Sequence, residues 1–209
     1  MVKNRKSLKI IEISLAIGLL FAVAWGAFSL HSQQELSDKV VRLHILANSD
    51  SDADQQLKLE VRDKVLARAS ELLQDTGDRG EAEKLLRKDL PNLQTIAEQE
   101  IHAEGYDYPV TAELKETAFP TKEYEGFTLP AGEYLALRII IGEGEGHNWW
   151  CVLFPPLCTQ ETTDVSSTAM AAGLSEDDIR LITEENNGYV LKFKSIELWE
   201  KLRQAISDK

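Results

Sequence analysis

The sequence predicts an α+β fold: a mainly antiparallel sheet with helices packed on one face, preceded by a hydrophobic N-terminal helix for export or anchoring. Three observations support it. Apolar residues alternate at strand spacing between 132 and 158, an apolar stripe of helical period covers 57–73, and an apolar run follows a basic head at the N-terminus. The predicted order of elements, β-α-α-β-β-β-α-β-α, is typical of an α+β domain.

The N-terminal thirty residues differ from the rest of the chain. Four basic residues precede the apolar run 13–30: Lys3, Arg5, Lys6 and Lys9. A basic head followed by an apolar body is typical of an export signal, because positive charge stays in the cytoplasm. We expect residues 1–30 to be a signal peptide, cut after Ala22-Val23-Ala24, or a membrane anchor near the lower length limit of ~20 residues.

The remainder is predicted to lie outside the cytoplasm, as a tether over 31–39 and a single domain over 40–209. Its Thr/Ser/Ala-rich stretch 159–173 is predicted to be a mobile loop. The formal net charge is −12 for the whole chain and −15 without residues 1–30. An acidic ectodomain disfavours binding to nucleic acid or anionic lipid, so membrane contact is expected only through the N-terminal segment.

The first half of the domain alternates between strand and helix patterns. Residues 39–47 read as a strand, and Asp52 with Gln55 has the spacing of a capping box that starts a helix ending at Gly77. Two further helices are predicted over 80–90 and 91–103, with Pro91 in the first turn of the latter.

The second half is rich in strand patterns. We predict a strand over 110–117, an edge piece over 119–124, and a central antiparallel hairpin over 132–158 whose strands are joined by a glycine-rich loop. A short helix to about residue 184, a strand and a last helix complete the chain, the final two elements over 189–194 and 196–206.

Two motifs resemble ligand sites only in part. The run Asp50-Ser51-Asp52-Ala53-Asp54 resembles the start of a calcium loop, but Gln55 and Val61 stand where glycine and glutamate are needed. A turn and helix cap is the preferred reading. The glycine loop 142–146 carries two glutamates and precedes a strand, so it is unsuited to phosphate. No metal or cofactor is expected.

Cys151 and Cys158 are the only cysteines. In an exported chain they can form a disulfide. Buried free thiols, or a nucleophilic Cys151 with His44 or His147 as base, remain alternatives. The adjacent Trp149 and Trp150 must point to opposite faces of a strand, so one enters the core and the other meets a helix or a partner.

Two long segments resemble a known family. VVRLHILANSDSDADQQLKLEVRDKVL (40–66) and GEYLALRIIIGEGEGHNWWCVLFPPLC (132–158), with GYDYPV, FPTKEY and LPAGEY between them, resemble the stage II sporulation protein R family of endospore-forming Gram-positive bacteria. The resemblance covers 40–158 and is weak from Thr159 on. The resemblance implies that the shared residues are either activation surface or fold determinants; they include Arg42, His44, Arg62, Asp63 and Arg138.

The resemblance implies a signalling protein made in the forespore and exported into the space between the forespore and mother-cell membranes. There it would trigger a membrane-embedded aspartyl protease of the mother cell, the sporulation protein GA. That protease removes the pro-sequence of sigma-E. The resemblance brings no catalytic residues, so an enzyme is not expected.

Two turns are predicted to contact the protease, because they border the most family-like strands and loops on rigid scaffolds often carry function. The predicted contact residues are Asn48, Asp50, Asp52, His147, Asn148, Trp149 and Trp150. One alternative is a hydrolase of the septal space that uses Cys151, His44 and Asp50 as nucleophile, base and orienting group. Another is a structural ectodomain that binds peptidoglycan.

Overall fold

The computed structural model describes residues 3–157 and 165–183, and the chain divides into two compact units, 1–35 and 36–209. Helix α1 runs from Lys3 to Ser37, so the residues predicted as a tether are helical as far as Ser37. Large apolar side chains between Ile10 and Val23 are exposed. Among the helices that the structure describes, none is both long enough and apolar enough to cross a membrane.

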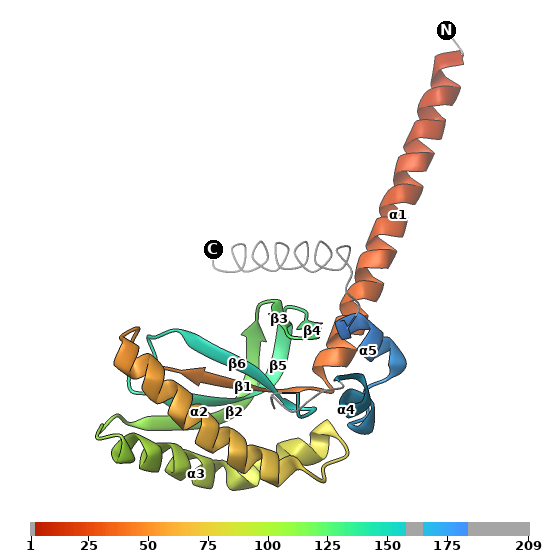
Figure 1. Ribbon diagram of the computed structural model, residues 1–209. Helices are drawn as coiled ribbons and strands as arrows, with labels where there is room; N and C mark the ends of the chain where they lie inside the picture. The colour runs from red at the N-terminus through yellow and green to blue at the C-terminus, as the bar shows by residue number, and fades with distance from the viewer. Residues whose placement is uncertain (1–2, 158–164, 184–209) are drawn as a thin grey trace. The chain divides into compact units, whose positions relative to one another are not determined.

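Four strands form the main sheet in the order β2-β5-β1-β6 (Figure 1). Their bounds are Val41–Leu46 for β1, Val110–Phe119 for β2, Gly132–Ile141 for β5 and Asn148–Phe154 for β6. Two of the three pairings, β2 with β5 and β1 with β6, are antiparallel. The α+β class and the mainly antiparallel sheet are therefore confirmed.

The predicted hairpin of 132–158 is wrong, because β1 lies between its two strands. β1 pairs parallel with β5, Leu43 opposite Leu137, and antiparallel with β6, Leu43 opposite Cys151. Five of the six residues of β1 are buried, which is the pattern of a strand covered on both faces. A strand of this kind is most stable in the middle of the sheet.

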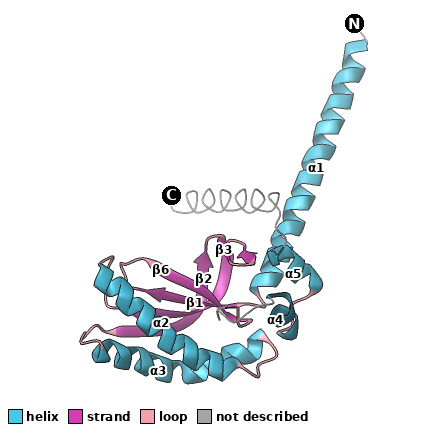
Figure 2. Cartoon of the chain, in the orientation of Figure 1, coloured by secondary structure: helices cyan, strands magenta, loops and turns pink. Residues whose placement is uncertain are grey.

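Helices α2 (Asp52–Leu73) and α3 (Arg79–Ala103) lie side by side across one face of the sheet (Figure 2). Ser51, and not Asp52, caps α2: its side-chain oxygen accepts from the backbone N–H of Asp54 at 3.2 Å. The two helices predicted around Pro91 are one continuous helix. The buried stripe that passes through Leu86, Leu93 and Ala97 outweighs the hydrogen bond that proline removes.

The other face of the sheet is also covered, so the prediction of helices on one face only is wrong. A two-stranded sheet of β3 (Lys122–Tyr124) and β4 (Phe127–Leu129) packs here, together with α4 (Val165–Ala171) and α5 (Glu176–Thr183). The buried side chains of this second core include Val40, Tyr134, Ala136, Val152, Phe119, Ala169, Ile179 and Ile182.

The C-terminal predictions fare unevenly. Residues 165–171, expected in a mobile loop, form α4, because buried Ala169 joins the second core. The short helix near 176–183 is confirmed as α5, and the Ser175 hydroxyl accepts from the backbone N–H of Asp178 at its start. The strand and helix predicted over 189–194 and 196–206 lie outside the described residues.

Candidate functional site

The turn after β1 and the loop after β5 meet at one edge of the sheet, because β1 and β5 are parallel and their carboxyl ends coincide. We call residues 47–51 the β1–α2 turn and 142–147 the β5–β6 loop. The loop lies along the turn: the backbone N–H of Gly146 donates to Ala47 O at 3.0 Å, and that of Glu145 to Asn48 O at 3.3 Å. The two segments thus form one continuous loop layer.

Side chains of the turn strengthen this layer. Asn48 Oδ1 accepts from the backbone N–H of Glu143 at 3.1 Å. Asp50 Oδ1 accepts from the backbone N–H of His147 at 2.6 Å and lies 2.5 Å from His147 Nδ1. Asp50 and His147 are exposed, with 55% and 78% of their side-chain surfaces accessible. The structure therefore brings the predicted contact residues Asn48 and Asp50 of the turn together with His147 of the loop, which lies 97 positions after Asp50.

Glycine is required where the loop approaches the turn. A Cβ atom on Gly146 would lie 2.2 Å from Ser49 O, and one on Gly142, whose φ is +57°, would lie 2.1 Å from Asn48 Oδ1. The glycine-rich composition therefore serves close packing onto the β1–α2 turn. This role differs from the one predicted from the sequence, where the glycine-rich loop joins the two strands of a hairpin.

Two buried charged residues that sequence reasoning missed support the layer from below. Burial favours a raised pKa for Asp54, but hydrogen bonds from Ser49 and Asn48 outweigh it and lower that pKa, so the carboxylate is ionised at neutral pH. Lys58 Nζ donates to His147 O at 2.9 Å, and burial lowers the pKa of this lysine. The sequence does indicate where Asp54 lies: it is three residues after Ser51, at the position whose backbone N–H a cap residue binds.

Asp52 and Asn148 border the loop layer. Asp52 is exposed as the first residue of α2, where its negative charge suits the helix N-terminus. Asn148 begins β6, and its Oδ1 lies 2.6 Å from His44 Nε2. His44 is buried; burial, foremost, lowers its pKa, and the positive charges of Arg138 and Arg42 add to this. Its imidazole is neutral at pH 7.

The remaining family residues lie on both faces of the sheet. Arg42 is fully buried, and its Nη2 donates to Tyr124 Oη at 2.6 Å. Arg138 forms an ion pair with Glu113 on the neighbouring strand. On α2, Arg62 pairs with exposed Asp63 at 2.7 Å. Tyr124 was not among the predicted site residues, although it belongs to the family-like FPTKEY segment.

Trp149 and Trp150 point to opposite faces, as predicted. Trp149 packs against the core beneath the helices, and the Arg62 guanidinium lies 5.1 Å from its ring centre. Trp150 packs on the second core, with its ring centre 6.0 Å from that of His44. Both side chains are half-buried.

The residues of the hydrolase alternative are not brought together. Cys151 pairs with Leu43 and shares the helix-covered face, whereas His44, the next residue of β1, faces the opposite side. Asp50 contacts His147 in the loop layer and not His44. No described cysteine carries a free thiol. Cys158 lies outside the described residues, so its pairing with Cys151 stays a prediction.

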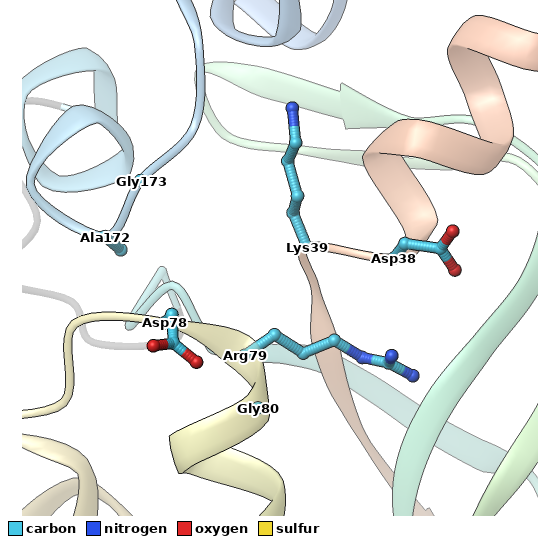
Figure 3. A pocket seen from close by; sticks show the side chains of 7 residues that line it. All are labelled: Asp38, Lys39, Asp78, Arg79, Gly80, Ala172 and Gly173. Carbon is cyan, nitrogen blue, oxygen red and sulfur yellow. The ribbon is translucent and has the colours of Figure 1, made fainter.

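Other polar features lie apart from the predicted residues. A pocket of about 300 Å³ is bordered by Lys39, Arg79 and Gly173 at the start of α3 (Figure 3). A second pocket, of about 500 Å³, lies near Leu73 and Thr168. Neither contains a residue of the loop layer.

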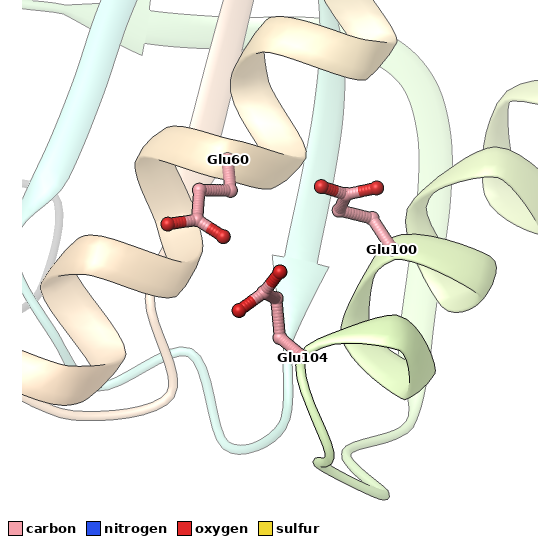
Figure 4. A group of neighbouring side chains, drawn as sticks. All are labelled: Glu60, Glu100 and Glu104. Atoms are coloured by element: carbon pink, nitrogen blue, oxygen red, sulfur yellow. The ribbon is translucent and has the colours of Figure 1, made fainter.

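Three carboxylates from α2 and the end of α3 also converge, with oxygen atoms within 4.8 Å of one another: Glu60, Glu100 and Glu104 (Figure 4). The negative charge of Glu60 is the main cause that raises the pKa of Glu104. Lys64 Nζ lies 3.6 Å from Glu100 and partly offsets the repulsion.

A model of the family described as Stage II sporulation protein R matches residues 37–164, a range that contains all of the predicted contact residues. This is more than half of the 209 residues. The chain belongs to the stage II sporulation protein R family. Family membership assigns the chain a role in sporulation.

Stage II sporulation protein R of Bacillus subtilis (strain 168) is 45% identical to the chain over 123 residues. The aligned part covers 59% of this chain and 55% of that relative, so the similarity spans about half the length of the curated protein. No solved structure matches the chain.

Proposed function

We propose that this sporulation protein is an exported signal that activates a membrane-embedded aspartyl protease of the mother cell, the sporulation protein GA. The activated protease would then process the pro-sigma-E factor. The proposal places the domain in the space between the forespore and mother-cell membranes, either tethered by residues 1–30 or released from them. The chain acts by binding and not by bond cleavage.

The loop layer is the observation that carries the proposal. Two segments predicted to contact the protease are hydrogen-bonded into one surface, and they present an exposed acid–imidazole pair, Asp50 and His147. A rigid sheet edge lies below them. Such a surface is pre-organised, so little conformational entropy is lost when a partner binds.

Activation requires that this surface binds the active state of the protease more tightly than the inactive state. A tenfold difference in affinity, about 1.4 kcal/mol, shifts the equilibrium between the two states tenfold. The exported location is supported by the basic head and the exposed apolar side chains of α1.

The test replaces Asp50→Asn and His147→Ala singly in a reconstituted system of this protein, the protease and pro-sigma-E. Both side chains are exposed, so the variants should fold normally. We expect each to reduce processing at least several-fold. Asn48 and Asp50 both hold the loop in place, but Asp50→Asn keeps an Oδ1 atom that can accept from His147 N–H and removes only the charge.

Asp75→Asn is the matched control. Asp75 is an exposed carboxylate beyond the other end of α2, roughly 30 Å from the loop layer by the rise of a 22-residue helix. It should leave processing unchanged. Normal processing by both folded loop variants would overturn the proposed contact surface, and normal processing without this protein would overturn the proposed function.

A further inference from the structure

Buried nitrogen atoms without a hydrogen-bond partner gather at one place in the sheet. Of the seven such side-chain atoms among the described residues, five belong to Arg42, His44, Arg138 and Trp150: Arg42 Nε and Nη1, His44 Nδ1, Arg138 Nε and Trp150 Nε1. Unpaired buried polar atoms are uncommon, because each loses its water without compensation. Four of the five atoms are N–H donors; His44 Nδ1 is the acceptor nitrogen of a neutral ring, because Nε2 faces the Asn148 oxygen. We call these four residues the donor face, after the N–H donors of Arg42, Arg138 and Trp150.

The strand register places the four side chains next to one another. His44 pairs with Arg138 of β5 on one side and with Trp150 of β6 on the other. Arg42 lies two residues before His44, on the same face of β1. The Phe119 ring links three of them: it lies 3.9 Å from the Arg42 guanidinium carbon, 5.7 Å from the His44 ring and 6.0 Å from the Trp150 ring.

The donor face is positively charged in a strongly acidic chain. Arg42 is fully buried, and the partner shown for its guanidinium is the neutral hydroxyl of Tyr124. The charge of Arg138 is only partly neutralised, because Glu113 forms ion pairs with both Arg138 and Lys115. Lys122 Nζ lies 5.9 Å from the Trp150 ring. A buried guanidinium without a carboxylate is costly, and an arriving carboxylate offers two oxygens that match its N–H donors.

We propose that the donor face binds a carboxylate side chain from an acidic segment of a partner protein. The Arg42 guanidinium has no carboxylate partner among the described residues and attracts a single carboxylate, whereas the net charge of −12 repels more strongly the many negative charges of nucleic acid or an anionic membrane. Arg138 and Trp150 are half-buried and so can be reached from solvent, whereas Arg42 and His44 are buried. The face adjoins the loop layer through the contact of His44 with Asn148, so one partner can cover both.

The test observes the donors directly and needs no partner protein. In the ¹⁵N-labelled full chain, the Nε–H signals of Arg42 and Arg138 and the indole N–H signal of Trp150 are followed by NMR. The probe is a tetraglutamate peptide with blocked ends, and the uncharged control is tetraglutamine. We expect saturable shifts of the three signals with tetraglutamate and none with tetraglutamine.

Arg62 and Trp149 form the matched internal control, because they make the corresponding cation–aromatic pair on the helix-covered side. Their N–H signals should not move. Equal shifts at Arg62 and Trp149, or no shifts at the donor face, would overturn the proposal. Inorganic phosphate is titrated in parallel, and tighter binding of phosphate than of the peptide would show a free-oxyanion site and overturn it as well.

Arg138→Gln then tests the donor itself. It should weaken tetraglutamate binding about tenfold, as expected for loss of a hydrogen bond to a charged group. Arg62→Gln should leave it unchanged. Arg138 is preferred to Arg42 because the fully buried Arg42 also holds the second core together. Unchanged affinity in a folded Arg138→Gln variant contradicts the proposal.

Discussion

Single atoms decide the shape of the loop layer. The backbone of Gly146 passes so close to Ser49 that any side chain would meet a carbonyl oxygen, which cannot rotate away. The side chains of Asn48 and Asp50 then close the gap between turn and loop with hydrogen bonds. The position of the Asp50–His147 pair therefore depends on the close packing of Gly146 and on the hydrogen bond of Asn48, although neither residue belongs to the pair.

We expect Gly146→Ala to lower the free energy of unfolding by about 1–3 kcal/mol, because the new methyl group must displace backbone atoms. Urea unfolding measures this difference. Gly77→Ala is the control, since nothing lies within 4 Å of its added Cβ, and it should change stability by less than about 1 kcal/mol. An equal effect of the two substitutions would contradict the packing role of Gly146.

The start of α2 supplies a second prediction about one residue. Ser51→Ala should cost about 1 kcal/mol of stability, because it removes the side-chain oxygen that accepts from Asp54 N–H. Asp52→Asn, compared at high salt to screen its charge from the helix dipole, should cost much less. Thermal unfolding of both variants measures the difference. A larger loss for Asp52→Asn would make Asp52 the cap after all.

Where α2 meets the end of α3, apolar packing stabilises the contact between the helices and charge repulsion destabilises it. Apolar residues hold the two helices together on the sheet, yet Glu60, Glu100 and Glu104 repel one another at their surface. The raised pKa of Glu104 means that its protonated form favours the fold. That stabilisation is complete below the pKa of unfolded glutamate and is lost as the pH rises through the folded value.

Glu104→Gln should therefore be more stable than the parent protein at pH 7, and the advantage should shrink as the pH falls towards about 4. Urea unfolding at the two pH values measures it. Glu125→Gln, which changes an exposed residue of the β3–β4 turn, should show no such pH-dependent gain. A constant difference across the pH range would show that repulsion by Glu60 is not the cause.

Element positions were more predictable from sequence than their pairing. The alternating pattern located β1, β2, β5 and β6, because it reflects which face each residue of a strand presents. The pattern does not indicate which strand lies next to which, so it could not predict that β1 lies between β5 and β6. The prediction that a helix ends before Pro91 was wrong for a different reason. The low helix propensity of proline was outweighed by the buried apolar stripe of α3.

The candidate site was predictable in part for the same reason. Two turns were chosen because each follows a family-like strand, and the parallel pairing of β1 with β5 places them together. The burial of Arg42 and the hydroxyl of Tyr124 beside it depend on packing between segments about eighty residues apart. Only the folded chain shows that relation.

For the molecule as a whole, the two units differ in kind. Unit 36–209 contains both cores, and buried Leu36 marks its beginning. A chain that lacks residues 1–35 should therefore unfold cooperatively, with the near-ultraviolet circular dichroism of packed tryptophans. Absence of a cooperative transition would show that the first unit is needed for folding.

The predicted Cys151–Cys158 bridge also concerns the stability of the whole domain. It would close an eight-residue loop, and the chain-entropy estimate gives about 2–3 kcal/mol. Reduction, or Cys158→Ala, should lower the free energy of unfolding by that amount. Thiol titration of the unfolded, unreduced protein should find no reactive thiol; two reactive thiols would exclude the bridge.

The central position of β1 has a consequence for the timing of folding. Its two neighbours, β5 and β6, are made 94 and 108 residues later at the level of Leu43, so the middle of the sheet stays open until most of the domain has been synthesised. Long-range pairing of this kind is slow. If the chain is exported as we propose, such a delay is an advantage, because the polypeptide remains extended until its last strands have passed through the translocation channel.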